Sequence, residues 1–281
     1  MVLVNSEIIT KTVKRLFIES AFYIPEDILN ALKDAKEKET EELPKSVLDN
    51  LILNHKIARE EHIPICQDTG MAVVFIELGK DVTIKGQNIY DAVNQGVSQA
   101  YKEGYLRKSV VSDPLFDRKN TSDNTPAVIY TDIVDGEKIK ITVGAKGFGS
   151  ENMSAIKMMN PTQTVQEVED FIVSVVENAG SKPCPPVIVG VGIGGTFDKA
   201  AVLSKKALLR PIDEENEDKR YAEMEKRLLK RINSLKIGPA GIGGNTTALA
   251  VNINTYPTHI AGLPVAVNIC CHAARGKQAI I

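Results

Sequence analysis

Three of the four cysteines in this 281-residue chain lie far apart, and each stands beside small, polar or proline residues. Cys66 begins the run Cys-Gln-Asp-Thr-Gly, Cys184 precedes two prolines, and Cys271 follows Cys270 near the last residue. Because 118 residues (184 − 66) and 87 residues (271 − 184) separate them, only folding could bring these thiols together. Three converging thiolates without a fourth protein ligand would suit an iron–sulfur cluster whose remaining iron is open for Lewis-acid chemistry.

A zinc site is the main alternative for these cysteines. Zinc sites usually contain close pairs such as C-x-x-C, whereas the three cysteines are scattered and Cys270 and Cys271 are adjacent. We expect one of this adjacent pair to point away from the cluster into the core. Four cysteines in a chain of this length favour reduced thiols over a disulfide framework.

Asp68 lies two residues after Cys66, in a turn that ends at Gly70. A carboxylate beside a metal-bound substrate could act as a general acid or base. The alternative is an Asx turn in which the aspartate caps its own backbone, and for an isolated Asp-Thr-Gly this is the commoner case. The adjoining thiol and the Gln67 amide favour a functional role, because one loop could then serve metal, substrate and proton.

The four histidines divide into two pairs. His55 falls on the apolar face of a predicted helix and His62 at its end, so both are interpreted as structural. His259 lies twelve residues before Cys271 (271 − 259), and His272 follows that cysteine directly. This proximity makes both candidates for contact with substrate or for proton handling.

A glycine-rich run at 190–195 matches the dinucleotide fingerprint G-x-G-x-x-G. It follows a predicted strand, precedes a predicted helix, and has Asp213 and Glu214 about 20 residues further on. However, no second βαβ pattern flanks it, and the predicted strand at 187–189 is very short. A tight turn or a helix N-terminus that holds a carboxylate is therefore favoured over nucleotide binding.

Composition excludes several classes of function. Apolar residues make up 43% and charged residues 25% of the chain, as in an ordinary globular protein. A net charge of −2 shows no basic excess for nucleic acid, and 5% aromatic residues without tryptophan argue against base stacking. The first residues lack a signal pattern and no apolar run reaches membrane-spanning length, so we expect a cytoplasmic protein.

Hydrophobic periodicity indicates which elements must position these residues. Residues 1–63 are predicted to be helical, and residues 64–281 to contain the sheet. Helices are predicted at 6–21, from Pro25, and at 44–61, 87–103, 164–179, 197–208 and 213–232, the last strongly charged and solvated. Strands are predicted at 72–78, 127–133, 138–143, 187–189, 249–253 and 264–269, with a hairpin across Asp135-Gly136.

These elements predict an α+β (mixed α/β) fold, in which the helical N-terminal segment packs around a central mixed β-sheet. We expect one domain over residues 1–281.

Four segments resemble motifs of the iron–sulfur hydro-lyases of the fumarate and tartrate type, the class I fumarate hydratases and L(+)-tartrate dehydratases. They are residues 65–70, 145–153, 184–196 and 264–275, and the resemblance runs from about residue 10 to the end. The long enzymes of this family carry two domains, which the short ones divide between an alpha and a beta subunit. This chain resembles the alpha subunit, the N-terminal domain of the long enzymes.

The resemblance implies reversible hydration of fumarate to (S)-malate, with L(+)-tartrate dehydration to oxaloacetate as the alternative. It also implies a [4Fe-4S] cluster held by Cys66, Cys184 and Cys271, whose fourth iron binds the hydroxy acid. The family's catalytic base, a threonine, lies in the other domain. The implied partner is therefore a beta subunit, in a hetero-oligomer of the alpha2beta2 type.

The same resemblance assigns roles to further side chains. Asp68 matches the acid that protonates the departing hydroxyl. Gln67, Arg107, Gly149 and His259 match substrate-binding positions, and the planar fork of Arg107 suits a substrate carboxylate.

Two other functions remain open from the residues alone. A non-catalytic cluster carrier would use a fourth cysteine ligand and would not need Asp68 or Arg107 near the cluster. A nucleotide-binding module would use the glycine-rich run. Among substrates, a methylated fumarate also remains open.

Overall fold

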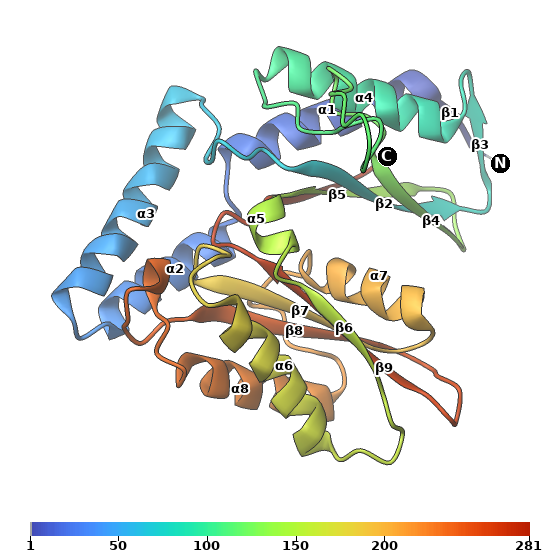
Figure 1. The fold of residues 1–281 in the computed structure, drawn as a ribbon. Helices are drawn as coiled ribbons and strands as arrows, with labels where there is room; N and C mark the ends of the chain where they lie inside the picture. Colours follow the sequence, from blue (N-terminus) through green and yellow to red (C-terminus); the bar gives the residue numbers. More distant parts are fainter. Residues whose placement is uncertain (1) are drawn as a thin grey trace. The chain divides into compact units, whose positions relative to one another are not determined.

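The computed structural model describes residues 2–281 and divides the chain into two compact units (Figure 1). The first unit comprises Met1–Pro25, His55–Phe148 and Arg275–Ile281, and the second comprises Glu26–Asn54 and Gly149–Ala274. Each unit has its own four-stranded mixed sheet and its own apolar core. The predicted α+β class is confirmed, with the sheet divided between the two units.

The first unit packs α1 (Ser6–Phe22) and α4 (Ile89–Glu103) against a four-stranded sheet. Its strand order is β10 (Gly276–Ile280), β5 (Ile139–Lys146), β2 (Met71–Gly79) and β4 (Val128–Val134). Strand β2 runs parallel to β4 and antiparallel to β5, which pairs in turn with antiparallel β10. A separate parallel pair joins β1 (Val2–Asn5) to β3 (Val82–Lys85).

The helices of this unit follow from their apolar spacing. In α1, Ile9, Val13 and Leu16 recur on one buried face, and the Asn5 side chain caps the helix by accepting the Glu7 N–H at 2.9 Å. The predicted helices at 6–21 and 87–103 are confirmed within a few residues at each end.

The predicted hairpin across Asp135-Gly136 is wrong, because β2 lies between β4 and β5. The turn reverses the chain, but it crosses the end of β2, where the Gly79 N–H donates to the Lys138 carbonyl at 2.9 Å. A side chain at Gly79 would meet the Gly136 oxygen at 2.5 Å, so only glycine permits this crossing. A local turn signal specifies a reversal of direction without specifying that the two strands are neighbours.

The second unit contains a sheet in the order β6 (Ala155–Met159), β9 (Leu263–Cys270), β7 (Val187–Gly194) and β8 (Ala248–Tyr256). Strand β7 is parallel to β8 and antiparallel to β9, and β9 is antiparallel to β6. Helices α6 (Val165–Ala179) and α8 (Lys219–Asn233) share the apolar core on one face, and α7 (Phe197–Ala207) packs on the other (Figure 1).

The remaining helices lie in or enter this unit. They are α2 (Glu26–Lys38), residues 42–54 of α3 (Glu42–Glu61), residues 149–151 of the short α5 (Phe148–Glu151), and the 3-10 turn Pro239–Gly241.

Strand β7 is longer than predicted, because it continues through the glycine-rich run to Gly194. A side chain at Gly190 would lie 2.2 Å from the Ser204 oxygen, and one at Gly192 would lie 2.1 Å from the Ala200 oxygen. The glycines therefore allow α7 to lie directly on the strand. They occupy a strand and not a phosphate-binding loop, which removes the geometric basis of the dinucleotide fingerprint.

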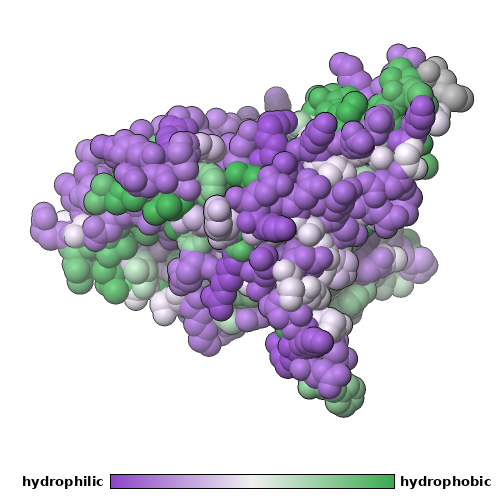
Figure 2. Space-filling view, turned by 90° about the horizontal axis from the view of Figure 1, so that it is seen from above, coloured by the Kyte–Doolittle hydropathy of each residue, from purple (hydrophilic) through white to green (hydrophobic). Residues whose placement is uncertain are grey.

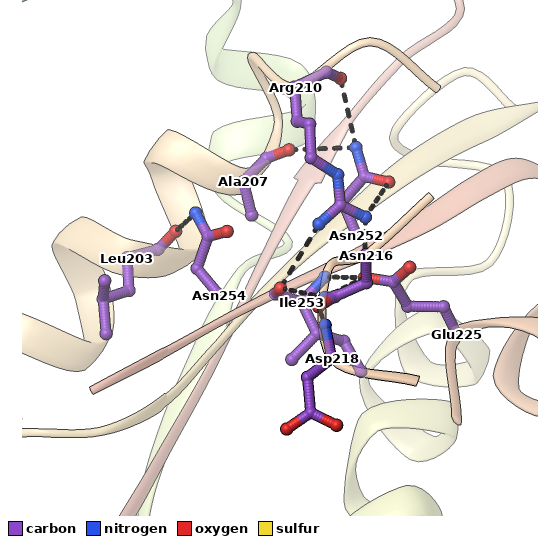
Figure 3. A network of polar contacts seen from close by, with 9 residues as sticks. All are labelled: Leu203, Ala207, Arg210, Asn216, Asp218, Glu225, Asn252, Ile253 and Asn254. Atoms are coloured by element: carbon purple, nitrogen blue, oxygen red, sulfur yellow. Dashed lines mark hydrogen bonds and ion pairs between the residues drawn. The ribbon is translucent and has the colours of Figure 1, made fainter. Parts of the chain in front are cut away.

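The predicted charged helix at 213–232 begins later, at Lys219, because the Asp218 side chain caps it by accepting the Arg220 N–H at 2.9 Å. Its charges are not all solvated. Glu225 is 8% exposed and accepts the Ile253 N–H at 2.6 Å and an Arg210 N–H at 2.7 Å (Figure 3). The Ile253 carbonyl accepts an N–H of Asn216 at 2.9 Å. These side chains satisfy backbone groups at the outer edge of β8, which would otherwise be open to another strand.

No helix in residues 2–281 is long and apolar enough to cross a membrane.

Candidate active site

The candidate acid Asp68 is held in a fixed orientation inside the first unit. One carboxylate oxygen accepts the Gly70 N–H at 2.9 Å, and the other accepts the Phe148 N–H at 2.9 Å. The first of these bonds is the predicted Asx turn, and the second comes from the segment after β5. Asp68 therefore makes the expected turn-forming bond and, in addition, a long-range bond that the sequence did not predict.

The backbone around Asp68 is held by buried side chains from other parts of the unit. Arg275, which is 5% exposed, donates to the Asp68 carbonyl. The Tyr101 hydroxyl lies 2.9 Å from the Thr69 carbonyl and 2.8 Å from the Gly70 carbonyl. Burial raises the pKa of Tyr101, so this hydroxyl stays protonated as a donor.

The Arg107 segment is connected to the same loop. The Thr69 hydroxyl donates to the Arg107 carbonyl at 3.0 Å, while the Arg107 side chain is exposed. Asn124, which is fully buried, donates to the Gly70 carbonyl at 3.2 Å and accepts the Ser109 N–H at 2.7 Å. The first unit thus holds Asp68 and Arg107 on one hydrogen-bonded framework.

Gln67 and Gly147 complete this half of the candidate site. The Gln67 side chain is exposed, and its carbonyl oxygen lies 3.5 Å from the Cys66 sulfur. A side chain at Gly147 would come within 3.2 Å of both an Asp68 oxygen and an Arg275 nitrogen. Glycine at this position therefore leaves the arginine and the aspartate undisturbed.

The second unit brings two of the predicted cluster ligands to one end of its sheet. Because Ile188 on β7 pairs with Cys270 on β9, Cys271 and the residues just before β7, including Cys184, lie at the same end. Cys184 is exposed and has a left-handed backbone (φ 55°), and its N–H donates to the Ser181 carbonyl at 3.1 Å.

The structure also separates the two adjacent cysteines. Cys270 is 8% exposed within β9, whereas Cys271 is partly exposed just after the strand ends. Successive side chains of a strand point to opposite faces, so one of the two faces the core as expected.

Gly149 and His259 lie elsewhere in the second unit. Gly149 is exposed in α5, and a side chain there would meet no atom within 4 Å. His259 is exposed in the turn between β8 and β9, which begins where β7 ends, because the Thr258 hydroxyl donates to the Gly195 carbonyl at 2.9 Å. The length of β7, about 25 Å for its 8 residues, lies between His259 and Cys184. Within this unit, His259 does not join the two thiols.

The donor chemistry fits the predicted iron–sulfur group. Cys66, Cys184 and Cys271 are all at least partly exposed, and none of them is in a disulfide. Thiolates are the usual ligands of such clusters. One of these thiols belongs to the first unit and two to the second, and in residues 2–281 no group of three or more His, Cys, Asp or Glu side chains forms a metal site. The three-cysteine ligand set stays a prediction.

Sequence reasoning missed the residues that support the Asp68 loop. Tyr101 falls on an ordinary apolar helix face, and Asn124 lies in a polar loop without a periodic pattern. In the sequence, Arg275 was noted only as the last residue of the motif at 264–275. Their contacts are made to backbone carbonyls across 31 to 207 residues, and such contacts leave no local signal.

Comparison with known proteins gives consistent matches over nearly the whole chain. The family model described as Fumarate hydratase (Fumerase) matches residues 10–280. A Methanocaldococcus jannaschii protein named "Putative L(+)-tartrate dehydratase subunit alpha" is 44% identical over 271 residues, which is 95% of each chain. The "L(+)-tartrate dehydratase subunit alpha" of Escherichia coli K12 is 33% identical over 256 residues, 90% of this chain and 84% of that one.

Proposed function

Because the chain belongs to the fumarate hydratase (Fumerase) family, we propose that it is the alpha subunit of a hydro-lyase acting on a four-carbon dicarboxylate. The reaction proposed first is the reversible hydration of fumarate to (S)-malate. The second candidate is dehydration of L(+)-tartrate to oxaloacetate, which the names of the relatives favour. The observation that carries the proposal is the Asp68 carboxylate, oriented by two backbone N–H groups beside an exposed amide and a thiol.

Three candidate residues of the first unit have proposed parts in the elimination. Asp68 gives its proton to the departing hydroxyl, which leaves as water, and the carboxylate remains. The exposed Arg107 guanidinium binds the substrate carboxylate remote from the leaving group, and the Gln67 amide binds beside it. Because Thr69 ties Arg107 to the Asp68 loop, substrate bound by the arginine is aligned with the acid.

Cys66, Cys184 and Cys271 would hold the cluster. When bound, a [4Fe-4S] cluster with three protein ligands supplies a Lewis acid that polarises the hydroxyl and the neighbouring carboxylate. The exposure of the three thiols and their freedom from disulfides support this set. Gly149 remains a proposed substrate contact. His259 lies the length of β7 from Cys184 in the same unit, so we do not propose that it contacts a substrate bound beside that thiol.

The base that removes the proton alpha to the carboxylate is proposed to come from a beta subunit, in an alpha2beta2-type assembly. We also propose a cytoplasmic location, because cysteines outside disulfides stay reduced there.

Anaerobic reconstitution tests the proposed function. The chain is mixed with iron, sulfide and the beta-type subunit from the same source, and malate, fumarate and L(+)-tartrate are assayed in parallel. We expect no turnover from the chain alone and turnover of one of the substrates after mixing. Activity from the pure chain would refute the division between subunits, and the ratio of kcat/KM values decides between malate and tartrate.

A further inference from the structure

Two large apolar side chains project from one loop of the first unit. Leu115 is 70% exposed and its neighbour Phe116 is 84% exposed. Single exposed apolar residues are common, and Figure 2 shows small hydrophobic patches within a largely hydrophilic face. A leucine and a phenylalanine side by side at a loop tip form a larger apolar surface of the kind found at protein interfaces.

The loop that carries them, residues 108–122, is a hydrogen-bonded hairpin that we term the finger. Val111 and Asn120 form an antiparallel bridge on its two sides. Beside this bridge, the Ser112 N–H donates to the Lys119 carbonyl at 2.8 Å. The finger therefore has a paired stem that supports its tip.

The tip is ordered by one carboxylate. Asp113 accepts the backbone N–H groups of Leu115 at 3.0 Å, of Asp117 at 3.2 Å, and of Phe116. The Arg118 side chain closes the turn by donating to the Pro114 carbonyl. Leu115 and Phe116 are thus displayed on a scaffold that is already formed, which lowers the entropy lost when a partner binds them.

The base of the finger belongs to the framework of the candidate site. Asn124 joins Ser109, at the start of the finger, to the Gly70 carbonyl beside Asp68, and Arg107 directly precedes the finger. A stem of about seven residues extends at most about 25 Å. The tip therefore lies within about 25 Å of the Arg107 backbone, a distance that a folded subunit seated on Asp68 and Arg107 can span.

The charge of the finger also indicates what it binds. Residues 108–122 contain three basic side chains and two acidic ones, a net charge of +1 (3 − 2), and the basic Arg107 directly precedes them. An apolar tip with a basic surround fits a complementary surface that has an apolar pocket and an acidic rim.

We propose that the finger docks into such a pocket on the beta subunit and seats that subunit over Asp68 and Arg107. The inference rests on the proposed function, because it names the surface through which the proposed partner binds. The relatives' names, which designate an alpha subunit, favour a different chain over a second copy as the occupant.

The double variant Leu115→Ser/Phe116→Ser tests the finger in the full, cluster-loaded chain. Titration calorimetry with the beta-type subunit should show binding at least about 30-fold weaker, as for the loss of one interface hot spot. The kcat at saturating beta subunit should equal that of the wild type. The matched control Ile133→Ser changes a 75%-exposed residue on β4 of the same unit and should leave binding unchanged. The conservative pair Leu115→Met/Phe116→Met should bind within a few-fold of the wild type.

Three results would overturn the finger's role. The first is an unchanged affinity of the serine double variant for the beta-type subunit. The second is an equal weakening of that affinity in Ile133→Ser. The third is a loss of self-association of the double variant in sedimentation, without any loss of binding to the beta-type subunit. The last result would assign the tip to a second copy of this chain. Failure of the two wild-type chains to associate would instead overturn the two-subunit function itself. Equal melting temperatures and iron contents establish that the variants are folded.

Discussion

The two units of the molecule contain sheets with the same pattern of strand directions. In the first, the central strand β2 is parallel to β4 and antiparallel to β5, and β5 is antiparallel to the edge strand β10. In the second, β7, β8, β9 and β6 have the same relationships in the same order. In both units the central strand precedes, in the chain, the two strands that flank it in the sheet.

The candidate residues occupy corresponding places in the two sheets. Cys66 precedes the central strand β2, and Cys184 precedes the central strand β7. Gly147 follows β5, and Cys271 follows the corresponding strand β9. Both units therefore present their candidate chemistry where the central strand begins and its antiparallel neighbour ends.

The units differ in how those places are supported. Buried side chains of Tyr101, Asn124 and Arg275 bind the backbone of the Asp68 loop. In the second unit, bonds at the Cys184 segment join backbone groups, such as the Pro185 carbonyl and the Ala240 N–H at 2.8 Å. If Asp68 is the acid, as proposed, the side chains that hold its loop serve the fixed orientation that a proton donor needs.

The largest expected effect concerns the thiols of both units. Cys66→Ser, Cys184→Ser and Cys271→Ser should each lose the cluster and all activity, while Cys270→Ser largely keeps both, because Cys270 is buried in β9. The iron content per chain and the brown absorbance of the cluster measure its loss. Equal iron loss in Cys270→Ser and Cys271→Ser would show that the ligand assignment is wrong.

The second largest effect is expected at Asp68, the proposed proton donor of the first unit. Asp68→Asn should lower kcat by about 10²- to 10⁴-fold, the usual contribution of a general acid, with the iron content retained. The control Asp135→Asn changes a carboxylate whose side chain is 90% exposed, and its kcat should match the wild type. A fall of less than threefold in the Asp68 variant would exclude it as the acid.

The third effect concerns the free energy of unfolding, through the ion pair at the β8 edge of the second sheet. Arg210→Ala leaves Glu225 buried without its ion-pair partner, so the free energy of unfolding should fall by about 3 kcal/mol in urea titration. Arg220→Ala breaks the exposed pair with Asp218 and should leave the urea midpoint unchanged. If the two variants unfold at the same urea concentration, Arg210 does not stabilise this edge.

A buried histidine should make stability depend on pH. Burial lowers the pKa of His55 from 6.5 to about 4. Between these values the unfolded chain binds a proton that the folded chain does not, so stability falls as pH is lowered from about 6.5 to about 4, by at most about 3 kcal/mol. His55→Gln should remove this part of the pH dependence of urea unfolding. His62→Gln, at an exposed position, should retain it.

The smallest effect tests the support of the Asp68 loop. Tyr101→Phe removes the hydroxyl shared by the Thr69 and Gly70 carbonyls, and should cost about 1–2 kcal/mol in unfolding free energy together with part of kcat. Tyr90→Phe, on the exposed side of the same helix, should change neither quantity. A loss of stability with unchanged kcat would assign Tyr101 a role in packing alone.

The sequence by itself determined the elements that depend on local patterns. Apolar spacing in α1 and β-branched residues in β2 act between near neighbours, so they are visible without coordinates. The same holds for the thiol of Cys66 and the carboxylate of Asp68, the side chains to which we assign the proposed chemistry.

Only the tertiary structure decided which strands are neighbours and what holds the site. The insertion of β2 between β4 and β5, the placement of Cys184 and Cys271 at one sheet end, and the Arg275 bond to the Asp68 carbonyl all join distant residues. Such contacts form through backbone groups that every residue carries, so residue type alone cannot reveal them.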